Sequence, residues 1–264
     1  MKKIFLATLL LVTMIFTGCG GDSSKTDSEK VLVIGLDDEY KPMGFRDKSG
    51  EIVGFDIDLA TEAAKRLGVK FEFKPIDWND KERELTSGKI DIIWNGLDIA
   101  PERKGYILYS KPYMDNRQII LVTKGNTQGI TSEANLAGKK IGTQAGSTSE
   151  TYIVHNTAFK DSLGEFRTYG NYKTALKDLE NGVVDALVCD EILSRYEVGI
   201  NPDRFEIIDV TIGTPCEIGI GFRKGEIELR DEIQKVFDEM IADGTAKKIS
   251  EKWFHADLIK RSGD

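Results

Sequence analysis

Apolar, β-branched runs alternate with amphipathic stretches along most of this chain, and that order limits the folds it can adopt. The clearest helix is predicted over FDIDLATEAAKRLG (55–68), where aliphatic and small residues recur at helical spacing and a glycine ends the pattern. The predicted strands are 31–35, 69–73, 90–94, 139–143 and 183–188, and further helices are predicted over 79–88, after Ser147 and over 172–182. Alternating segments of this kind predict open α/β sheets of mostly parallel strands.

An internal repeat divides this pattern into two parts. LTSGKIDIIWNG (85–96) and LENGVVDALVCD (179–190) share Leu-x-x-Gly-x-(Ile/Val)-Asp-x-(Ile/Leu) at an offset of 94 residues. A weaker echo relates VIGLD (33–37) to KIGTQ (140–144). The echoes align Gly96 with Asp190 and Asp37 with Gln144, all just past predicted strands. Because open α/β sheets bind ligands at the carboxyl ends of their strands, we expect two lobes that face each other across a cleft.

The N-terminal segment is a targeting signal and not part of the fold. Two lysines, a short apolar run and small residues predict a signal peptide over residues 1–18. The stretch resembles a bacterial lipobox, in which the cysteine that follows, here Cys19, is lipidated, although Phe16 stands where leucine is usual. After its cysteine, the segment 19–30 has no apolar residue and predicts a flexible tether. The expected location is outside the cytoplasm, anchored to the cell membrane as a lipoprotein.

Composition narrows the classes of partner and cofactor. The net charge of −8 makes nucleic acid and anionic membrane surfaces poor partners. Two histidines lie far apart, and no cysteine–histidine cluster, phosphate-binding glycine motif or nucleophile–base pair is present, so we expect no metal and no cofactor. Cys189 and Cys216 form a disulfide or remain as two thiols, and the sequence leaves both alternatives open.

The stretch WNGLDIAPER (94–103) has the residue types of a site for a small zwitterion. Gly96 lets backbone groups approach a ligand closely, and Pro101 suits the first position of a helix. Arg103 then falls in the first turn, where a cation opposes the helix dipole. Its planar fork is better explained by a carboxylate partner, and the alternative is a solvated surface arginine beside Glu102.

Two further features complement that arginine. Ser147 and Glu150 form a capping-box pattern, so the helix that begins here presents free amides to an anion. Asp190 ends a strand, where a buried carboxylate is costly without a cation, and a ligand ammonium is one such partner. Asp98 supplies a second acid. Aromatic residues near strand ends are candidates for the wall of a pocket: Tyr40, Phe45, Trp78 and Trp94. For Phe45 and Trp94 the alternative is a place in the hydrophobic core.

Together these residues resemble a known family, the extracellular amino-acid-binding proteins of ABC transporters, which have the two-lobed periplasmic-binding-protein type II fold. The resemblance runs over nearly the whole chain after the predicted signal. It is carried by DDEYKPMGF (37–45), GEIVGFDIDLATEAAKRLG (50–68), IDWN (76–79), SGKIDIIWNGLDIAPERK (87–104), YSKPYMDNRQIILV (109–122), LAGKKIGTQAGSTSE (136–150), GVVDALVCDE (182–191) and IGIGFRKG (218–225).

The resemblance implies a role for each matched position. Arg103, with backbone amides at Asp98 and Thr148, would hold the ligand carboxylate. The Gly96 carbonyl and Asp190 would hold the ammonium. The remaining expected contacts are the aromatic walls and a position that faces basic side chains in some relatives. The full set of expected ligand-binding residues is Asp37, Tyr40, Trp78, Gly96, Asp98, Arg103, Ser147, Thr148 and Asp190.

Three positions depart from the family pattern. Relatives often have Ser or Thr at Asp98, and because an ionised carboxylate cannot donate a hydrogen bond, we assign this side chain to the ammonium. Many relatives have Thr at Ala100, so the helix that follows lacks a side-chain cap. Lys81 falls near a pocket position that is often apolar. Asp37 favours a basic ligand and Lys81 a polar or acidic one, and the sequence leaves this conflict open.

The resemblance also implies an architecture and a function. The first lobe would comprise residues 31–113 and 217–260, and the second lobe 114–216, with a two-segment hinge. The chain would be a monomeric receptor without enzymatic activity that captures a polar amino acid and delivers it to a membrane permease and its ATPase. The alternative is a dehydratase or lyase on the same scaffold, for which Glu217 is the candidate general acid.

Overall fold

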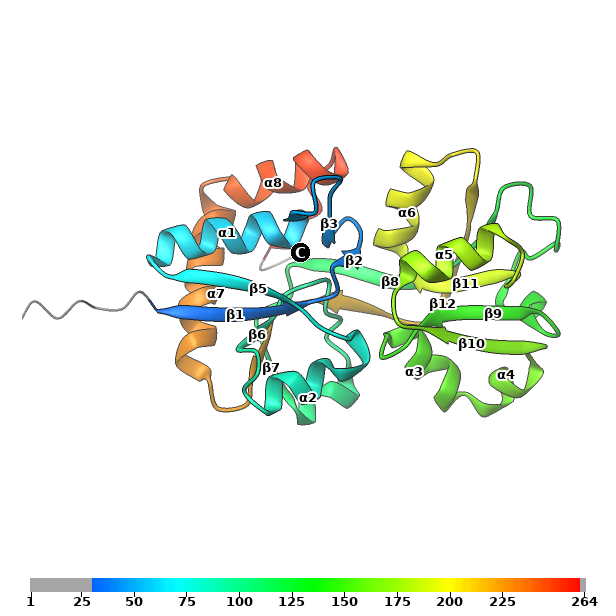
Figure 1. The fold of residues 1–264 in the computed structure, drawn as a ribbon, viewed down its shortest axis with the longest axis horizontal. Helices are drawn as coiled ribbons and strands as arrows, with labels where there is room; N and C mark the ends of the chain where they lie inside the picture. Colours follow the sequence, from blue (N-terminus) through cyan, green and yellow to red (C-terminus); the bar gives the residue numbers. More distant parts are fainter. Residues whose placement is uncertain (1–29, 262–264) are drawn as a thin grey trace, which may run out of the picture.

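The computed structural model describes residues 30–261, which form two lobes side by side, each built on its own sheet (Figure 1). The first-lobe sheet has the order β5 (Lys70–Pro75), β1 (Val31–Leu36), β6 (Ile92–Ile93), β13 (Gly221–Arg223), β7 (Ile107–Tyr109). The second-lobe sheet has the order β10 (Glu165–Tyr169), β9 (Lys140–Gln144), β11 (Ala186–Asp190), β8 (Met114–Thr123), β12 (Phe205–Ile218).

Helices cover each sheet. Those of the first lobe are α1 (Phe55–Leu67), α2 (Lys81–Thr86), α7 (Ile227–Ala242) and α8 (Thr245–Phe254). Those of the second lobe are α3 (Thr148–His155), α4 (Thr157–Ser162), α5 (Tyr172–Glu180) and α6 (Glu191–Ile200). Short 3₁₀ segments lie at η1 (Trp78–Asp80), η2 (Pro101–Gly105) and η3 (Glu133–Leu136). Within residues 30–261, no helix is both long enough and apolar enough to span a membrane.

The two sheets repeat one topology. In each, the first three strands are parallel neighbours, and the fourth strand, β13 or β8, is antiparallel to the strands on both sides of it. The fifth strand, β7 or β12, therefore runs in the direction of the first three. Four of the five strands in each sheet therefore run in the same direction, which agrees with the prediction of mostly parallel sheets. The departures from the parallel pattern in these two sheets are β13 and β8.

Several predicted elements have different bounds in the structure. The strand expected over 90–94 contains only Ile92 and Ile93, and the one expected over 183–188 begins later, so that Asp190 is its last residue. The helix expected after Ala100 is a five-residue 3₁₀ segment without a side-chain cap. A short 3₁₀ segment carries little dipole, which weakens the dipole argument made for Arg103.

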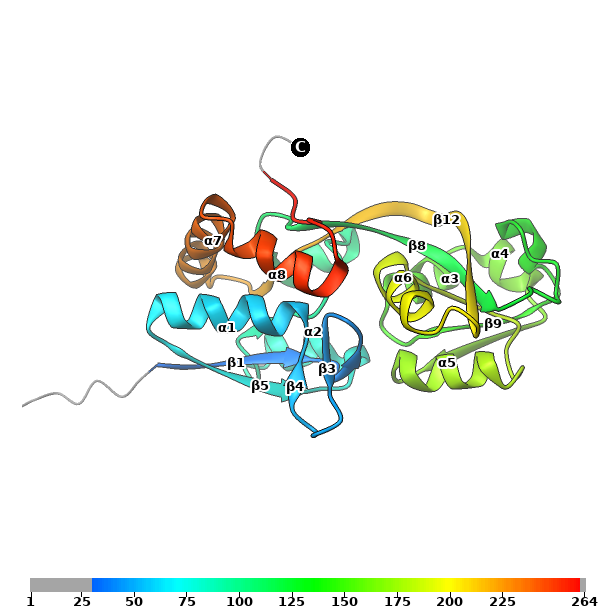
Figure 2. The same ribbon diagram turned by 90° about the horizontal axis from the view of Figure 1, so that it is seen from above.

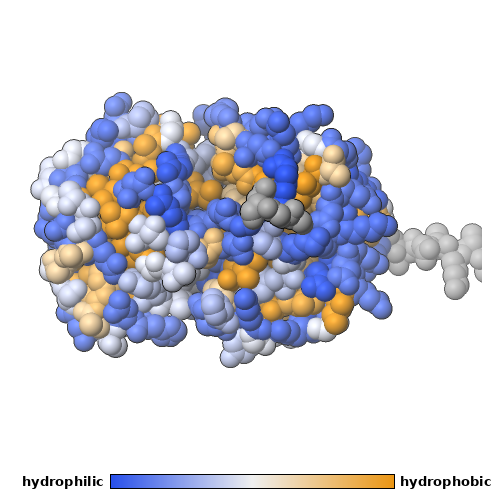
Figure 3. Space-filling view, turned by 180° about the vertical axis from the view of Figure 1, so that it is seen from behind, coloured by the Kyte–Doolittle hydropathy of each residue, from blue (hydrophilic) through white to orange (hydrophobic). Residues whose placement is uncertain are grey.

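Two long paired strands connect the lobes. β8 and β12 run side by side between them (Figure 2), from the pair Met114–Ile218 to the pair Thr123–Phe205. Register shifts interrupt their ladder on either side of Ile212. Seen from behind, the surface is notched between the lobes (Figure 3). The expected crossings of the chain fall within or beside these strands, and the lobe boundaries at 113/114 and 216/217 stay a prediction.

Two of the four candidate aromatic residues belong to the core. Trp94 is fully buried and contacts Phe237 edge to face, with 6.2 Å between ring centroids. Phe45 meets Trp253 edge to face at 5.8 Å. The sequence analysis did not foresee the small antiparallel sheet that contains Phe45, formed by β2 (Glu39–Tyr40), β3 (Gly44–Arg46) and β4 (Ile52–Val53). This sheet positions Tyr40 at the junction of the lobes.

Candidate ligand-binding site

One small cavity between the lobes is lined by every residue expected to bind a ligand. Its free volume of about 10 Å³ is room for about one water molecule, so an amino acid would enter only after the lobes had separated. Its lining comprises Asp37, Tyr40, Trp78, Gly96, Asp98, Arg103, Ser147, Thr148 and Asp190, together with Gln144. The structure thus brings the nine residues together, while their part in binding stays a prediction.

The strand ends explain how residues so far apart in sequence meet. Asp37 follows β1 directly, and Gly96 lies three residues past β6. From the second lobe, Gln144 and Asp190 end β9 and β11, and Ser147 precedes α3. These are carboxyl ends of parallel strands, where ligands bind in open α/β sheets.

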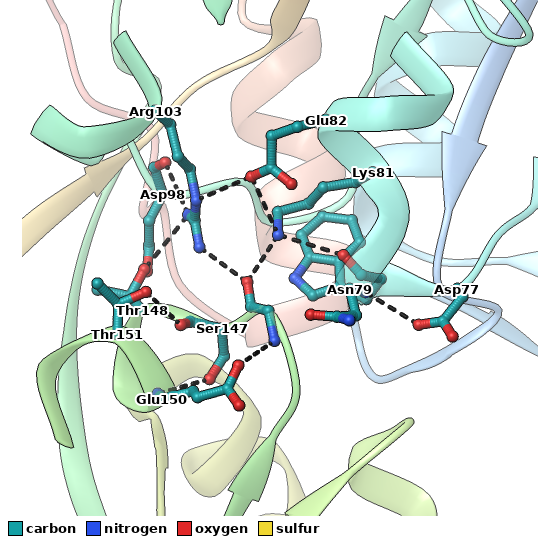
Figure 4. A network of polar contacts seen from close by, with 12 residues as sticks. Asp77, Asn79, Lys81, Glu82, Asp98, Arg103, Ser147, Thr148, Glu150 and Thr151 are labelled. Atoms are coloured by element: carbon teal, nitrogen blue, oxygen red, sulfur yellow. Dashed lines mark hydrogen bonds and ion pairs between the residues drawn. The ribbon is translucent and has the colours of Figure 1, made fainter. Parts of the chain in front are cut away.

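Arg103 is buried and reaches across the cleft (Figure 4). Its guanidinium donates to the Gly146 carbonyl at 2.9 Å, and to the Thr148 hydroxyl and the Asp98 carbonyl at 3.3 Å each. The Glu82 carboxylate lies 3.4 Å from its Nε. The alternative of a solvated surface arginine beside Glu102 was therefore wrong. In the tertiary structure η2 lies against the second lobe, so the guanidinium of Arg103 faces the cleft.

The N-terminus of α3 forms one wall of the cavity. The Ser147 hydroxyl accepts the Glu150 amide at 3.0 Å, which confirms the expected cap. Glu150 accepts from the Gly146 amide at 2.6 Å, one residue before the position that an ideal capping box would use. The first amides of this helix and the Arg103 guanidinium lie at the same end of the cavity, which suits a carboxylate.

Two acids lie at the other end, and their partners are neutral. The Tyr40 hydroxyl donates to Asp190 at 2.8 Å. The Asn116 amide donates to Asp190 at 2.6 Å and to Asp98 at 2.9 Å, and the Gln118 amide to the same acids at 2.8 and 3.2 Å. Among the described residues, neither acid forms an ion pair. The sequence analysis missed both amides, although two polar side chains at i and i+2 in an otherwise apolar strand were a usable signal.

Asp37 meets its counterpart from the weaker sequence echo. The Gln144 amide donates to the Asp37 carboxylate at 2.6 Å across the cleft, and the Asp37 amide donates to Asn95 at 3.0 Å. Burial raises the pKa of Asp37 to about 6, partly offset by the hydrogen bonds from Glu39 and Gln144. A cation that reached this carboxylate would relieve the cost of burial.

Gly96 cannot be replaced by a larger residue without strain. Its φ is 60°, and a Cβ atom here would lie 2.6 Å from Cε1 of Tyr40. Its amide donates to the fully buried Asp56 carboxylate at 2.6 Å, and Asp56 also accepts the Tyr113 hydroxyl at 2.8 Å. Asp56 therefore fixes the turn that borders the cavity. The sequence did not mark Asp56 as special, because an acid in the first turn of a helix is common.

Lys81 does not line the cavity. Its side chain is buried, and its amine donates to the Trp78 carbonyl at 3.2 Å and across the cleft to the Gly146 carbonyl at 2.6 Å (Figure 4). Burial, followed by the charge of Arg103, lowers the pKa of Lys81 to about 8. The conflict between Asp37 and Lys81 over the ligand disappears, because only Asp37 faces the cavity.

Replacing Lys81 by methionine is expected to favour the open form of the ligand-free protein. The substitution removes a charged donor that bridges the lobes, and such hydrogen bonds contribute about 1.5–3 kcal/mol. We expect a larger radius of gyration in X-ray scattering and roughly 10-fold weaker ligand binding. Lys89→Met, at an exposed lysine of the same lobe, is the control. Identical scattering and affinity for the two variants would contradict the bridging role.

The two cysteines within the described residues are free. The thiol of Cys189 is buried and lies 3.1 Å from the Ser194 hydroxyl. The disulfide alternative for Cys189 and Cys216 was therefore wrong: β11 and β12 lie on opposite sides of β8, which separates the two thiols. The signal peptide over 1–18 and the lipidation of Cys19 lie outside the described residues.

The chain belongs to the bacterial extracellular solute-binding proteins, family 3, whose family model matches residues 32–256. It is 32% identical over 237 residues to the L-cystine-binding protein TcyJ of Escherichia coli, which covers 90% of this chain and 87% of that protein. The family is extracellular, which agrees with the expectation of a location outside the cytoplasm.

Solved structures agree with this assignment. A substrate-binding protein of an ABC uptake transporter from Streptococcus pneumoniae, with bound histidine, matches at a TM-score of 0.82 and 34% identity over 88% of this chain and 95% of that one. An ancestral arginine-binding protein with bound arginine matches at a TM-score of 0.78 and 42% identity, over 86% and 99% of the two chains. The expected fold class, two α/β lobes of the periplasmic-binding-protein type II kind, is confirmed.

Proposed function

We propose that this chain is the amino-acid receptor of an ABC importer and that one polar amino acid binds in the cavity between its lobes. The carrying observation is the polarity of that cavity: a guanidinium and a helix N-terminus at one end, and two carboxylates at the other. Arg103 and the amides of Asp98 and Thr148 would hold the ligand carboxylate. Asp190, Asp98 and the Gly96 carbonyl would hold its ammonium.

The side chain of the ligand would lie toward Asp37, Tyr40 and Trp78. Asp37 and the Gln144 amide offer an acceptor and a donor, so a side chain with an amine, guanidinium or imidazole group fits this end best. The charge balance favours the same class, because Arg103 is the one cation among the residues that line the cavity, beside three acids. The names of the relatives, which bind cystine, histidine or arginine, agree with a polar ligand.

Closure of the lobes would exchange one set of contacts for another. In the present structure, cross-cleft hydrogen bonds join Tyr40 to Asp190 and Gln144 to Asp37, and they use groups expected to bind the ligand. A ligand that bridges both lobes stabilises the closed form, and bending of β8 and β12 would allow the opening. The permease and its ATPase would then recognise the closed, loaded form.

Lipidation at Cys19 would hold the receptor at the membrane. Cleavage after residue 18 would leave this cysteine as the N-terminus, and a diacyl anchor supplies the two chains that stable attachment needs. The segment 19–30 would act as the tether. We further propose that the receptor is a monomer without enzymatic activity.

The dehydratase alternative finds no support in the position of Glu217. This side chain is paired with Lys260 at 2.7 Å and lines a separate pocket outside the cavity, beside Asn116 and Cys216. A general acid must lie within hydrogen-bond reach of the group that it protonates. Turnover of arogenate or prephenate by the purified chain would revive this alternative.

Calorimetry tests the proposed function directly. We expect at least one polar amino acid, among the twenty standard ones with cystine and ornithine, to bind with a Kd of about 1 μM or tighter. Basic amino acids are expected to bind more tightly than acidic ones, because Asp37 repels a second carboxylate. A flat titration with every ligand would contradict the proposal.

A further inference from the structure

Asp98 and Asp190 form a buried acid pair held by two amides. The Asn116 Nδ2 atom lies 2.9 Å from one carboxylate and 2.6 Å from the other, so both acids lie within hydrogen-bond reach of a single nitrogen. The Gln118 Nε2 atom repeats this arrangement at 3.2 and 2.8 Å. All four side chains are at most 7% exposed. We name these four residues the acid–amide cluster.

The neighbouring groups fix the orientation of one amide. The Ser149 hydroxyl donates to the Gln118 Oε1 atom, which leaves the Nε2 atom to face the acids. Asn116 and Gln118 are two residues apart on β8, so their side chains project from the same face of the strand. The Asn116 Oδ1 atom is buried without a partner among the described residues, while the Nδ2 atom donates to both acids.

Amide donors cannot neutralise two negative charges. Two buried carboxylates that contact the same nitrogen atom favour the uptake of one proton by the pair. Burial, and then the charge of Asp98, raise the pKa of Asp190 to about 6. No cation among residues 30–261 pairs with either carboxylate, since the Arg103 guanidinium donates to the Asp98 backbone carbonyl instead.

The phenols and thiols around the cluster stay neutral between pH 5 and 8. Burial raises the pKa of each surrounding phenol and thiol above its ordinary value, which already lies above this range. These groups are Tyr40 and Tyr109 from the first lobe, Tyr113 beside the hinge, Tyr172 and Cys189 from the second lobe, and Cys216 on β12. Among the other residues that line the cavity, Asp37 also has a raised pKa, about 6, so it needs its own control.

We propose that Asn116 and Gln118 hold Asp98 and Asp190 as a proton-sharing pair and that the ligand ammonium displaces the shared proton. Below about pH 6, the empty receptor carries one proton and one net negative charge on the pair. When the ammonium binds, both carboxylates are ionised and the proton passes to solvent, while no covalent bond forms or breaks. This inference rests on the proposed function, and it makes capture of the amino acid an exchange of one cation for another.

The exchange sets the direction of the pH dependence. Binding releases a proton, so the affinity rises with pH until the empty pair has lost its proton, and is constant above that point. Below about pH 6, each unit of acidification is expected to weaken binding by up to about 10-fold, the limit for one proton. Without proton exchange, the affinity would be independent of pH across the same range.

Calorimetry in buffers of different ionisation enthalpy counts the released protons. At pH 5.5 we expect up to about one proton per ligand for the wild-type chain. Asp98→Asn keeps the shape and removes one acid, so the release that comes from the pair is expected to vanish, and any release that remains would come from Asp37. Because the pKa of Asp37 is also near 6, Asp37→Asn is the matched control, and its proton release should persist whatever its affinity. Release that vanished with Asp37→Asn and survived Asp98→Asn would overturn the proposal.

Gln118→Met tests the positioning role. Loss of one donor to both acids should strengthen the hold on the shared proton, and so move the midpoint of the pH–affinity curve upward. Gln118→Asn, with a shorter side chain that keeps the amide, should shift it less. A purely structural role would lower the melting temperature of both variants and leave the midpoint unchanged.

A titration without ligand separates this inference from the proposed function. Carbon-13 NMR of the aspartate carboxyl groups in the empty protein should show one group of the pair with a raised midpoint, absent in Asp98→Asn. If no amino acid binds but this midpoint is found, the proposed function fails and the proton-sharing pair stands. Ordinary midpoints for both acids, near 4, would overturn the pair itself.

Discussion

Arg103→Met is expected to weaken amino-acid binding by at least about 100-fold, the equivalent of ~3 kcal/mol. The guanidinium is the one cation that lines the cavity, and without it a ligand carboxylate would be buried against neutral groups only. Methionine keeps the apolar stem, so the melting temperature of the empty protein should stay within a few degrees. Calorimetry with the best ligand, and a thermal melt without ligand, measure the two effects.

An arginine outside the cleft provides the control. Arg167 lies on β10, is half-exposed and pairs with Glu165, so Arg167→Met should leave the affinity unchanged. An Arg103→Met protein that melts far below the wild type would assign this arginine to the stability of the fold. Unchanged affinity in a well-folded variant would remove it from the ligand site.

Asp56→Ala is expected to produce the largest loss of stability among these variants, about 3–5 kcal/mol in the free energy of unfolding. The substitution leaves the Gly96 amide and the Tyr113 hydroxyl buried without their acceptor. For a protein of this size, the melting temperature should fall by roughly 10 °C. Glu62→Ala, on the same helix but at a solvent-accessible ion pair with Arg66, should cost less than ~1 kcal/mol.

The pH dependence of this loss has a definite sign. Burial raises the pKa of Asp56 to about 7 in the folded protein. The folded state therefore binds more protons than the unfolded state between about pH 4 and 7, and this group contributes stability that is lost as the pH rises through that range. Asp56→Ala removes the contribution. Its destabilisation, measured by denaturant unfolding, should thus be larger at pH 5 than at pH 8, and equal values would show that Asp56 is ionised throughout.

The helices and strands could be predicted mainly from local periodicity. The pattern over 55–68 gave a helix with its glycine end correctly placed, since Gly68 adopts the left-handed conformation that favours glycine. The short strand β6 was predicted too long because apolar residues on both sides of it are also buried, which periodicity cannot distinguish. The small sheet that contains Tyr40 depends on contacts between segments with weak local preference, so it was missed.

The candidate site was predictable where it follows from strand ends and from the family pattern. Asp190 and Gln144 were marked by the repeats, and Arg103 by its unusual place near a helix start. Asn116 and Gln118 were not found, because they contact the acids from the middle of a strand that belongs to neither repeat. Their role depends on β8 crossing behind the cavity, which no local pattern encodes.

The sequence by itself determined the alternation of elements, the duplication of the lobes and the residue types that meet at their strand ends, because these depend on local periodicity and on the chemistry of single side chains. Only the tertiary structure decided which groups these side chains form hydrogen bonds with. It turned Lys81 from a candidate pocket residue into a bridge to Gly146, and it placed Asp98 and Asp190 between two neutral amides. The physical reason is that the cost of burying a charge depends on which donors and acceptors surround it, and those come from segments far apart in the chain.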